Sequence, residues 1–127
     1  MQTGEDCGRD RWTLTVQTDG SRTLRSFVNL SRDGSQLNMI YRASDDFHFI
    51  DAFENAWHDG KLVGSGLYVA NGSQLHMVTT GPGGLATDDL SLPESYSVIL
   101  HPVSADGWHF ARYDLARGGP QALTIFV

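Results

Sequence analysis

Apolar and polar residues alternate along most of the chain, and short turn sequences interrupt the alternation. An Asp-Gly pair occurs at 19–20, 33–34, 59–60 and 106–107, and an Asn-Gly pair occurs at 71–72. These pairs favour tight hairpin turns because their residues tolerate the positive φ angles that such turns require. Alternation with a period of two is typical of a half-buried strand. The pattern therefore predicts a mainly β protein built from successive hairpins.

The predicted strands follow one another with short connections, which is typical of an antiparallel meander that forms a barrel or half-barrel. A length of 127 residues suits one core. We expect residues 11–127 to form a single β domain and the polar residues 1–10 to form a disordered N-terminal segment. Six apolar residues of the alternating runs are expected in the core: Trp12, Leu14, Val28, Leu30, Leu100 and Ile125.

Residues 45–58 fit two interpretations. The apolar residues Phe49, Ile50, Phe53, Ala56 and Trp57 have helical spacing, which allows one short helix in this segment. The aromatic content and the Asp-Gly pair that follows favour a strand, with Phe47, Phe49, Phe53 and Trp57 on one face. That strand would place Asp51 and Asn55 on the apolar face, which costs free energy unless both are paired. We prefer the strand and keep the helix as the alternative.

The formal net charge of −6 limits the classes of partner that the protein can bind. A phosphate backbone requires clustered Lys and Arg side chains, and the chain has no basic run, so we predict no binding to nucleic acid. No apolar stretch is long enough to span a bilayer, so no membrane span is predicted. Met1 to Asp10 lacks the apolar core of a secretion leader, which favours a cytoplasmic location or a leader that has been removed.

Aromatic side chains supply the clearest candidate site. Small barrels with an aromatic lining either pack solidly or hold one apolar ligand. Trp57 and Trp108 each lie close to an Asp-Gly pair, so we expect both rings at a rim of the sheet, where a ligand would enter. The predicted ligand-binding residues are Tyr41, Phe49, Phe53, Trp57, Tyr68, Trp108 and Phe110.

Candidate catalytic groups are fewer. His101 and His109 flank the predicted turn that contains Asp106 and would meet across a hairpin. The other candidates are Asp51, Glu54 and His58. These three would share one helix face, whereas in a strand Glu54 and His58 share a face and Asp51 lies opposite. Carboxylates near a histidine can perform acid–base work. The histidine spacings match no metal-binding motif, so neither a metal nor another cofactor is predicted.

Two segments carry a family resemblance. Residues 54–62 (ENAWHDGKL) and residues 113–119 (YDLARGG) resemble hairpin motifs of bacterial exported domain families of unknown function. Those families are thought to form curved antiparallel half-barrels, akin to lipoprotein-localisation factors. The resemblance implies an exported protein with a lipid-like or other apolar ligand and no catalytic set.

Three functions therefore compete. We expect a small β domain that binds an apolar small molecule in an aromatic cavity. The first alternative is a small barrel enzyme, such as an isomerase, cyclase or hydratase, that uses histidine and carboxylate groups in that cavity. The second alternative is a protein-interaction module. A buried histidine–carboxylate pair inside the cavity would favour the enzyme, and a flat exposed apolar patch over a filled core would favour the interaction module. Whether the chain is an enzyme, and its oligomeric state, stay open.

Overall fold

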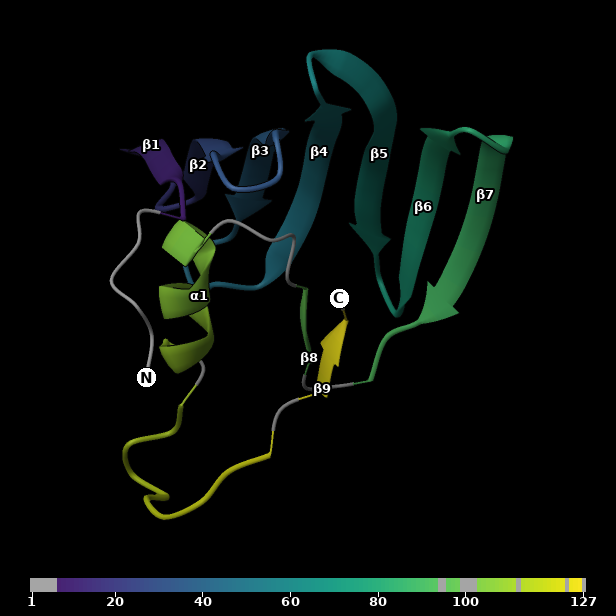
Figure 1. Cartoon of the computed structure of the whole chain (residues 1–127). Coiled ribbons are helices and arrows are strands. Elements are labelled where there is room, and N and C mark those ends of the chain that lie inside the picture. Colours follow the sequence, from purple (N-terminus) through teal and green to yellow (C-terminus); the bar gives the residue numbers. More distant parts are fainter. Residues whose placement is uncertain (1–6, 94–95, 99–102, 112, 123, 127) are drawn as a thin grey trace.

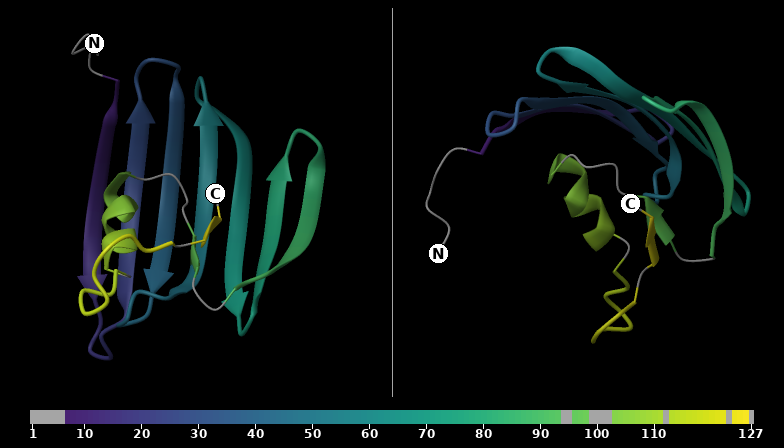
Figure 2. Two further views of the ribbon diagram at one scale, coloured as in Figure 1. Left: turned by 90° about the horizontal axis from the view of Figure 1, so that it is seen from below. Right: turned by 45° about the vertical axis from the view of Figure 1, so that its right-hand side comes forward.

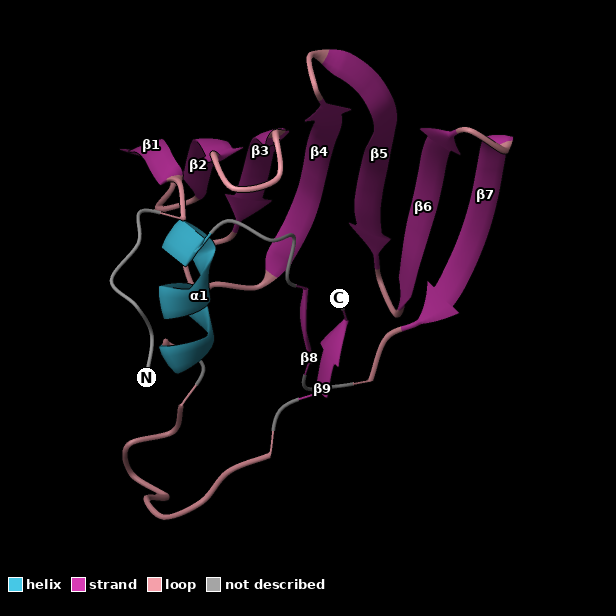
Figure 3. Ribbon diagram, in the orientation of Figure 1, coloured by secondary structure: helices cyan, strands magenta, loops and turns pink. Residues whose placement is uncertain are grey.

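A computed structural model describes residues 7–93, 96–98, 103–111, 113–122 and 124–126 (Figure 1). Strands dominate the described residues, and α1 is their only helix (Figure 3). No described helix has the length and apolar character needed to cross a membrane. The elements are β1 (Arg9–Val16), β2 (Arg22–Leu30), β3 (Ser35–Ala43), β4 (Phe49–His58), β5 (Lys61–Asn71), β6 (Gln74–Gly81), β7 (Gly84–Ser91), β8 (Tyr96–Val98), α1 (Val103–Phe110) and β9 (Thr124–Phe126).

The main sheet has seven strands in the order β1-β2-β3-β4-β5-β6-β7, and each strand is antiparallel to the next. The sheet is strongly curved and open, with α1, β8 and β9 on its concave side (Figure 2). Strands β8 and β9 form a separate parallel pair. The predicted all-β meander is therefore confirmed, and the sheet does not close into a barrel.

Tight turns occur at four of the five predicted dipeptides and also at Pro82-Gly83, between β6 and β7. Asp59 (φ 49°) and Gly60 (φ 73°) join β4 to β5, and two positive φ angles in succession define the turn that matches the twist of a hairpin. The other Asp-Gly and Asn-Gly pairs also lie at hairpin connections, except Asp106-Gly107, which lies within α1. The prediction of a hairpin at 106–107 is wrong.

Most of the ambiguous segment is a strand, since β4 covers Phe49–His58, whereas residues 45–48 belong to the loop before it. The short helix of the structure lies later in the chain, at Val103–Phe110, where alternation had predicted a strand through Trp108 and Phe110. The helix is held by contacts with distant residues, described below, and local alternation does not report such contacts.

The core lies on the concave face of the sheet. The strand registers place Leu24, Tyr41, Ala52, Tyr68 and Met77 in one row across β2 to β6. Leu24, Tyr41 and Ala52 are buried, and Tyr68 and Met77 pack against the same core cluster. The core therefore runs along the middle of the curved sheet.

Most of the expected core residues lie elsewhere. Val28 is buried as predicted, whereas Trp12 is 56% exposed, and Leu14, Leu30 and Ile125 are also exposed. Trp12 and Leu14 lie on β1, an edge strand, so a neighbouring strand packs on one side only. Leu100 lies outside the described residues. Alternation identifies the apolar side of a strand, but not whether another element covers that side.

Strand β1 begins at Arg9, inside the segment that was predicted to be disordered. One carboxylate oxygen of Asp10 accepts a hydrogen bond from the Ser26 hydroxyl at 2.6 Å, and the other accepts one from the Ser104 backbone N–H at 3.2 Å. An acidic side chain is favourable at the start of a helix, where backbone N–H groups lack partners. Asp10 therefore connects the first two strands to the first turn of α1.

Candidate functional site

An aromatic cluster joins α1 to the concave face of the sheet. The ring of Tyr41 lies 5.1 Å from the ring of Phe49 and 5.1 Å from that of Trp108, centroid to centroid, and Phe47 lies 5.9 Å from Trp108. All three pairs have the edge-to-face arrangement that aromatic quadrupoles favour. Trp108 is thus the side chain through which the helix packs on β3 and on the loop that precedes β4.

That loop, residues 44–48, has a local structure that fixes Phe47. The Ser44 hydroxyl accepts the His48 N–H at 3.0 Å, and Phe47 takes a positive φ of 64°. The Arg22 guanidinium donates to the backbone carbonyls of Ser44 and Asp45 and lies 4.1 Å from the centroid of the Phe47 ring. The cation therefore holds the turn and the aromatic ring together.

A hollow of about 620 Å³ opens beside this cluster. Phe49 and Tyr96, both members of the core, contribute aromatic walls, and Ile50, Ala70 and Leu92 add aliphatic surface. His48 and Ser73 supply polar groups. The hollow is further lined by Gly72 and Pro93. Ligand pockets typically measure roughly 300–1,000 Å³ and combine an apolar lining with a few polar groups, as this hollow does.

The polar groups near the hollow include a carboxylate–imidazole pair. His48 Nδ1 lies 2.8 Å from a carboxylate oxygen of Asp46. Hydrogen bonds from the Ser44 hydroxyl and from His48 hold the pKa of Asp46 well below its usual value. Asp46 is therefore a stable anion beside His48, on the loop that supplies one side of the hollow.

Glu54 and Tyr68 form the clearest polar pair on the concave face. The Tyr68 hydroxyl donates to Glu54 Oε1 at 2.7 Å, and burial together with this neighbouring carboxylate raises the pKa of Tyr68. Gly66 makes the arrangement possible, because a Cβ there would lie 2.6 Å from the Tyr68 hydroxyl oxygen. The pair keeps a carboxylate satisfied on an otherwise apolar surface.

The predicted aromatic set is divided between the two faces. Tyr41, Phe49 and Trp108 come together in the cluster, and Tyr68 packs against the same core. Strand register places Phe53 and Trp57 on the convex face, and Phe110 is 80% exposed at the end of α1. Because Trp108 is on a helix and Trp57 points to the opposite face of the sheet, they do not flank a shared opening.

The candidate catalytic groups do not converge among the residues that the structure describes. Asp51 accepts from Arg42 Nε at 2.7 Å on the convex face, and Glu54 lies on the concave face. His58 is exposed, 3.6 Å from Asp59. His101 lies outside the described residues, and only the backbone of His109 is described, in α1. No group of three metal-ligating side chains occurs within the described part of the chain.

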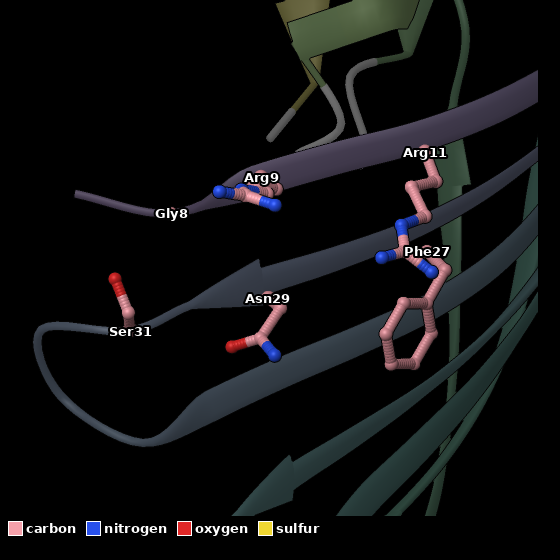
Figure 4. A pocket seen from close by; sticks show the side chains of 6 residues that line it. All are labelled: Gly8, Arg9, Arg11, Phe27, Asn29 and Ser31. Atoms are coloured by element: carbon pink, nitrogen blue, oxygen red, sulfur yellow. The ribbon is translucent and has the colours of Figure 1, made fainter. Parts of the chain in front are cut away.

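A second hollow, of about 410 Å³, lies on the convex side of β1 and β2 (Figure 4). Its lining residues are Gly8, Arg9, Arg11, Phe27, Asn29 and Ser31. Sequence reasoning missed it, because the arginines look scattered along the chain and only the strand register brings Arg11 opposite Phe27. The sequence signal for this hollow is the spacing of Arg9 and Arg11, which are two positions apart and therefore lie on the same side of a strand.

Comparison of the chain with protein-family models, curated proteins and solved structures finds no match.

Proposed function

We propose that this protein binds an apolar small molecule in the hollow beneath the curved sheet, where β4 begins and β5 ends. The observation that carries the proposal is the continuity of the hollow with the aromatic core, because Phe49 and Tyr96 belong to both. An apolar ligand there would remove aromatic and aliphatic surface from water, which is favourable by about 25 cal/mol per Å² buried.

The lining also indicates which end of the ligand is polar. His48 and Ser73 offer hydrogen-bonding groups, whereas Phe49 and Leu92 offer only apolar surface. A fatty acid or another amphiphile with one polar group matches this lining. The open, curved sheet with a helix on its concave side fits the half-barrel that the family resemblance implies, and this fit also supports an apolar ligand.

Native mass spectrometry of the freshly purified protein, followed by titration with fatty acids, tests the proposal. Ala70→Phe would fill the hollow without removing any core side chain, and Ala86→Phe makes the same change at an exposed position on β7. We expect a bound ligand in the mass spectrum or a saturable change in tryptophan emission. The affinity for the ligand should fall about tenfold or more in Ala70→Phe, which corresponds to about 1.4 kcal/mol, and should not change in Ala86→Phe.

Two results would contradict the proposal. One is the absence of any adduct and of any emission change across fatty acids of increasing chain length. The other is equal binding by Ala70→Phe and Ala86→Phe, which would place the ligand elsewhere. Thermal melts of both variants show whether the added ring disturbs the fold.

A further inference from the structure

The convex face of β1 and β2 concentrates positive charge on an acidic protein. Positions 9, 11, 13 and 15 of β1 share this face with positions 23, 25, 27 and 29 of β2, according to the strand register. Arginine occupies three of them: Arg9, Arg11 and Arg25. Neither Asp nor Glu occurs at these eight positions, although the whole chain has a net charge of −6. The face therefore attracts anions that the rest of the molecule repels.

Phe27 occupies the centre of this positive face. Its Cα partners are Arg11 on β1 and Asn38 on β3, and Arg25 and Asn29 are the neighbouring residues on the same side of β2. The Phe27 side chain is 39% exposed. A partly exposed aromatic ring is thus surrounded by two guanidinium groups and two carboxamide groups.

Two hollows meet at this ring. Arg11 and Phe27 line both the hollow of about 410 Å³ shown in Figure 4 and a smaller one of about 250 Å³ that also includes Arg25 and Asn38. Asn29 lines the larger hollow. The surface therefore brings a partly exposed aromatic ring, cationic groups and amide donors and acceptors together around two shallow hollows.

We propose that this face binds a nucleoside monophosphate. Guanidinium groups match the geometry of phosphate oxygens, so Arg11 would hold the phosphate while Arg25 adds positive charge beside it. A base would stack on Phe27, as bases do on aromatic side chains of nucleic-acid-binding sheets. Asn29 and Asn38 have the paired donor and acceptor that recognise the edge of a base.

Size and charge favour a single nucleotide over a strand of nucleic acid. Phe27 is the only aromatic residue at these eight positions, and Phe53 lies two strands away on β4, whereas proteins that bind single strands place successive bases on successive aromatic side chains. The acidic remainder of the molecule would also repel a polyanion. The site lies on the face opposite the aromatic core, so this inference is independent of the proposed apolar ligand.

Isothermal titration at low ionic strength with adenosine monophosphate, adenosine and inorganic phosphate tests the inference. We expect the monophosphate to bind at least about tenfold more tightly than either fragment. Arg11→Gln should weaken the monophosphate and leave adenosine unchanged, and Phe27→Leu should weaken both. Arg117→Gln, in an exposed loop, removes the same charge elsewhere and should change neither. Added salt should weaken the monophosphate more than adenosine.

Several outcomes would overturn the inference. Equal affinities for adenosine monophosphate and phosphate would show that Phe27 does not contribute to binding. An equal loss of affinity for the monophosphate in Arg11→Gln and Arg117→Gln would indicate unspecific electrostatic attraction. Tighter binding of a short single-stranded oligonucleotide, abolished by Arg11→Gln, would assign the face to nucleic acid instead. Chemical shifts of the Arg11, Phe27 and Asn29 amides that do not move with adenosine monophosphate would exclude the site, and melting curves confirm that each variant is folded.

Discussion

The phenol of Tyr68 links residue chemistry to stability on the concave face. Its pKa is raised by burial and by the hydrogen bond to Glu54, so folding favours the neutral phenol. This contribution is present below the unfolded value of about 10 and is lost as the pH rises toward the folded pKa. We expect the urea midpoint to fall above about pH 10, and to fall less in Tyr68→Phe.

At neutral pH the same substitution removes one hydrogen bond from the half-buried Glu54. A loss of about 1–2 kcal/mol is expected, because the carboxylate keeps its desolvation cost without its partner. An unchanged midpoint at neutral pH, together with an unchanged alkaline slope, would show that the pair contributes nothing to stability.

Leu24 and Trp12 provide a second test at the scale of single residues. Leu24 is 1% exposed, so Leu24→Ala should cost about 2–5 kcal/mol through lost burial and a residual cavity. Trp12 is 56% exposed on β1, so Trp12→Ala should cost less than about 1.5 kcal/mol although the ring is larger. Chemical denaturation measures both. A reversed order of the two losses would contradict the position of the core.

At the scale of elements, Asp10 controls how α1 meets the sheet. It accepts hydrogen bonds from Ser26 and from the Ser104 backbone, which joins β1, β2 and the helix. Asp10→Ala should cost about 1–2 kcal/mol, because a helix end and a buried hydroxyl both lose a partner. Faster amide exchange in α1 and a weaker near-ultraviolet signal from Trp108 would accompany the loss. Asp45→Ala, at an exposed position, serves as the control.

The comparison of β4 with α1 shows which elements the sequence can predict. β4 precedes Asp59-Gly60, a turn whose conformation these two residues favour by themselves, and its aromatic residues suit a strand. Asp106-Gly107 carries the same local preference, yet it lies in a helix that packs through Trp108 on Tyr41 and Phe47. Those partners are distant in sequence, so local pattern cannot report them.

The candidate sites show a similar limit. The grouping of Tyr41, Phe49 and Trp108 was predicted, because large aromatic residues on apolar faces usually share a core. A regular strand would place Phe49, Phe53 and Trp57 on one face. The register shift at Arg42 and Ala43 turns Phe49 to the opposite face, and alternation does not predict such a bulge. The face around Phe27 is formed by the pairing of β1, β2 and β3. The hydrophobic pattern does not predict the register of these strands, so it could not show which polar residues lie around Phe27.

At the scale of the whole molecule, the two edges of the sheet differ in their protection against association. β7 carries Asp88 and Asp89, and charged residues on an edge discourage pairing with another chain. β1 carries charged residues only at positions 9–11, and its remaining part, residues 12–16, has no charge and exposes Trp12, Leu14 and Val16 on one face. Unguarded apolar edges promote edge-to-edge contact, so the β1 edge should dominate self-association.

Leu14→Lys tests this expectation. The variant should scatter less light on heating at high protein concentration, with a change in unfolding free energy of about 1 kcal/mol or less, because Leu14 is exposed. Thr87→Lys adds the same charge to the β7 edge and should leave the scattering as it is in the parent protein. Equal effects of the two substitutions would mean that net charge, not the β1 edge, governs association.

The order of the strands also bears on how the chain acquires its fold. Every strand of the main sheet pairs only with its neighbours in sequence, so each pairing closes a short loop. Closing a short loop costs little chain entropy, which keeps the folding barrier low. The meander can grow hairpin by hairpin from any point, with no distant strand needed to begin. The packing of α1 joins segments far apart in sequence, through Trp108 with Tyr41 and Phe47 and through the hydrogen bond from Ser104 to Asp10. We therefore expect that step, and not the formation of the sheet, to be the slow one in refolding.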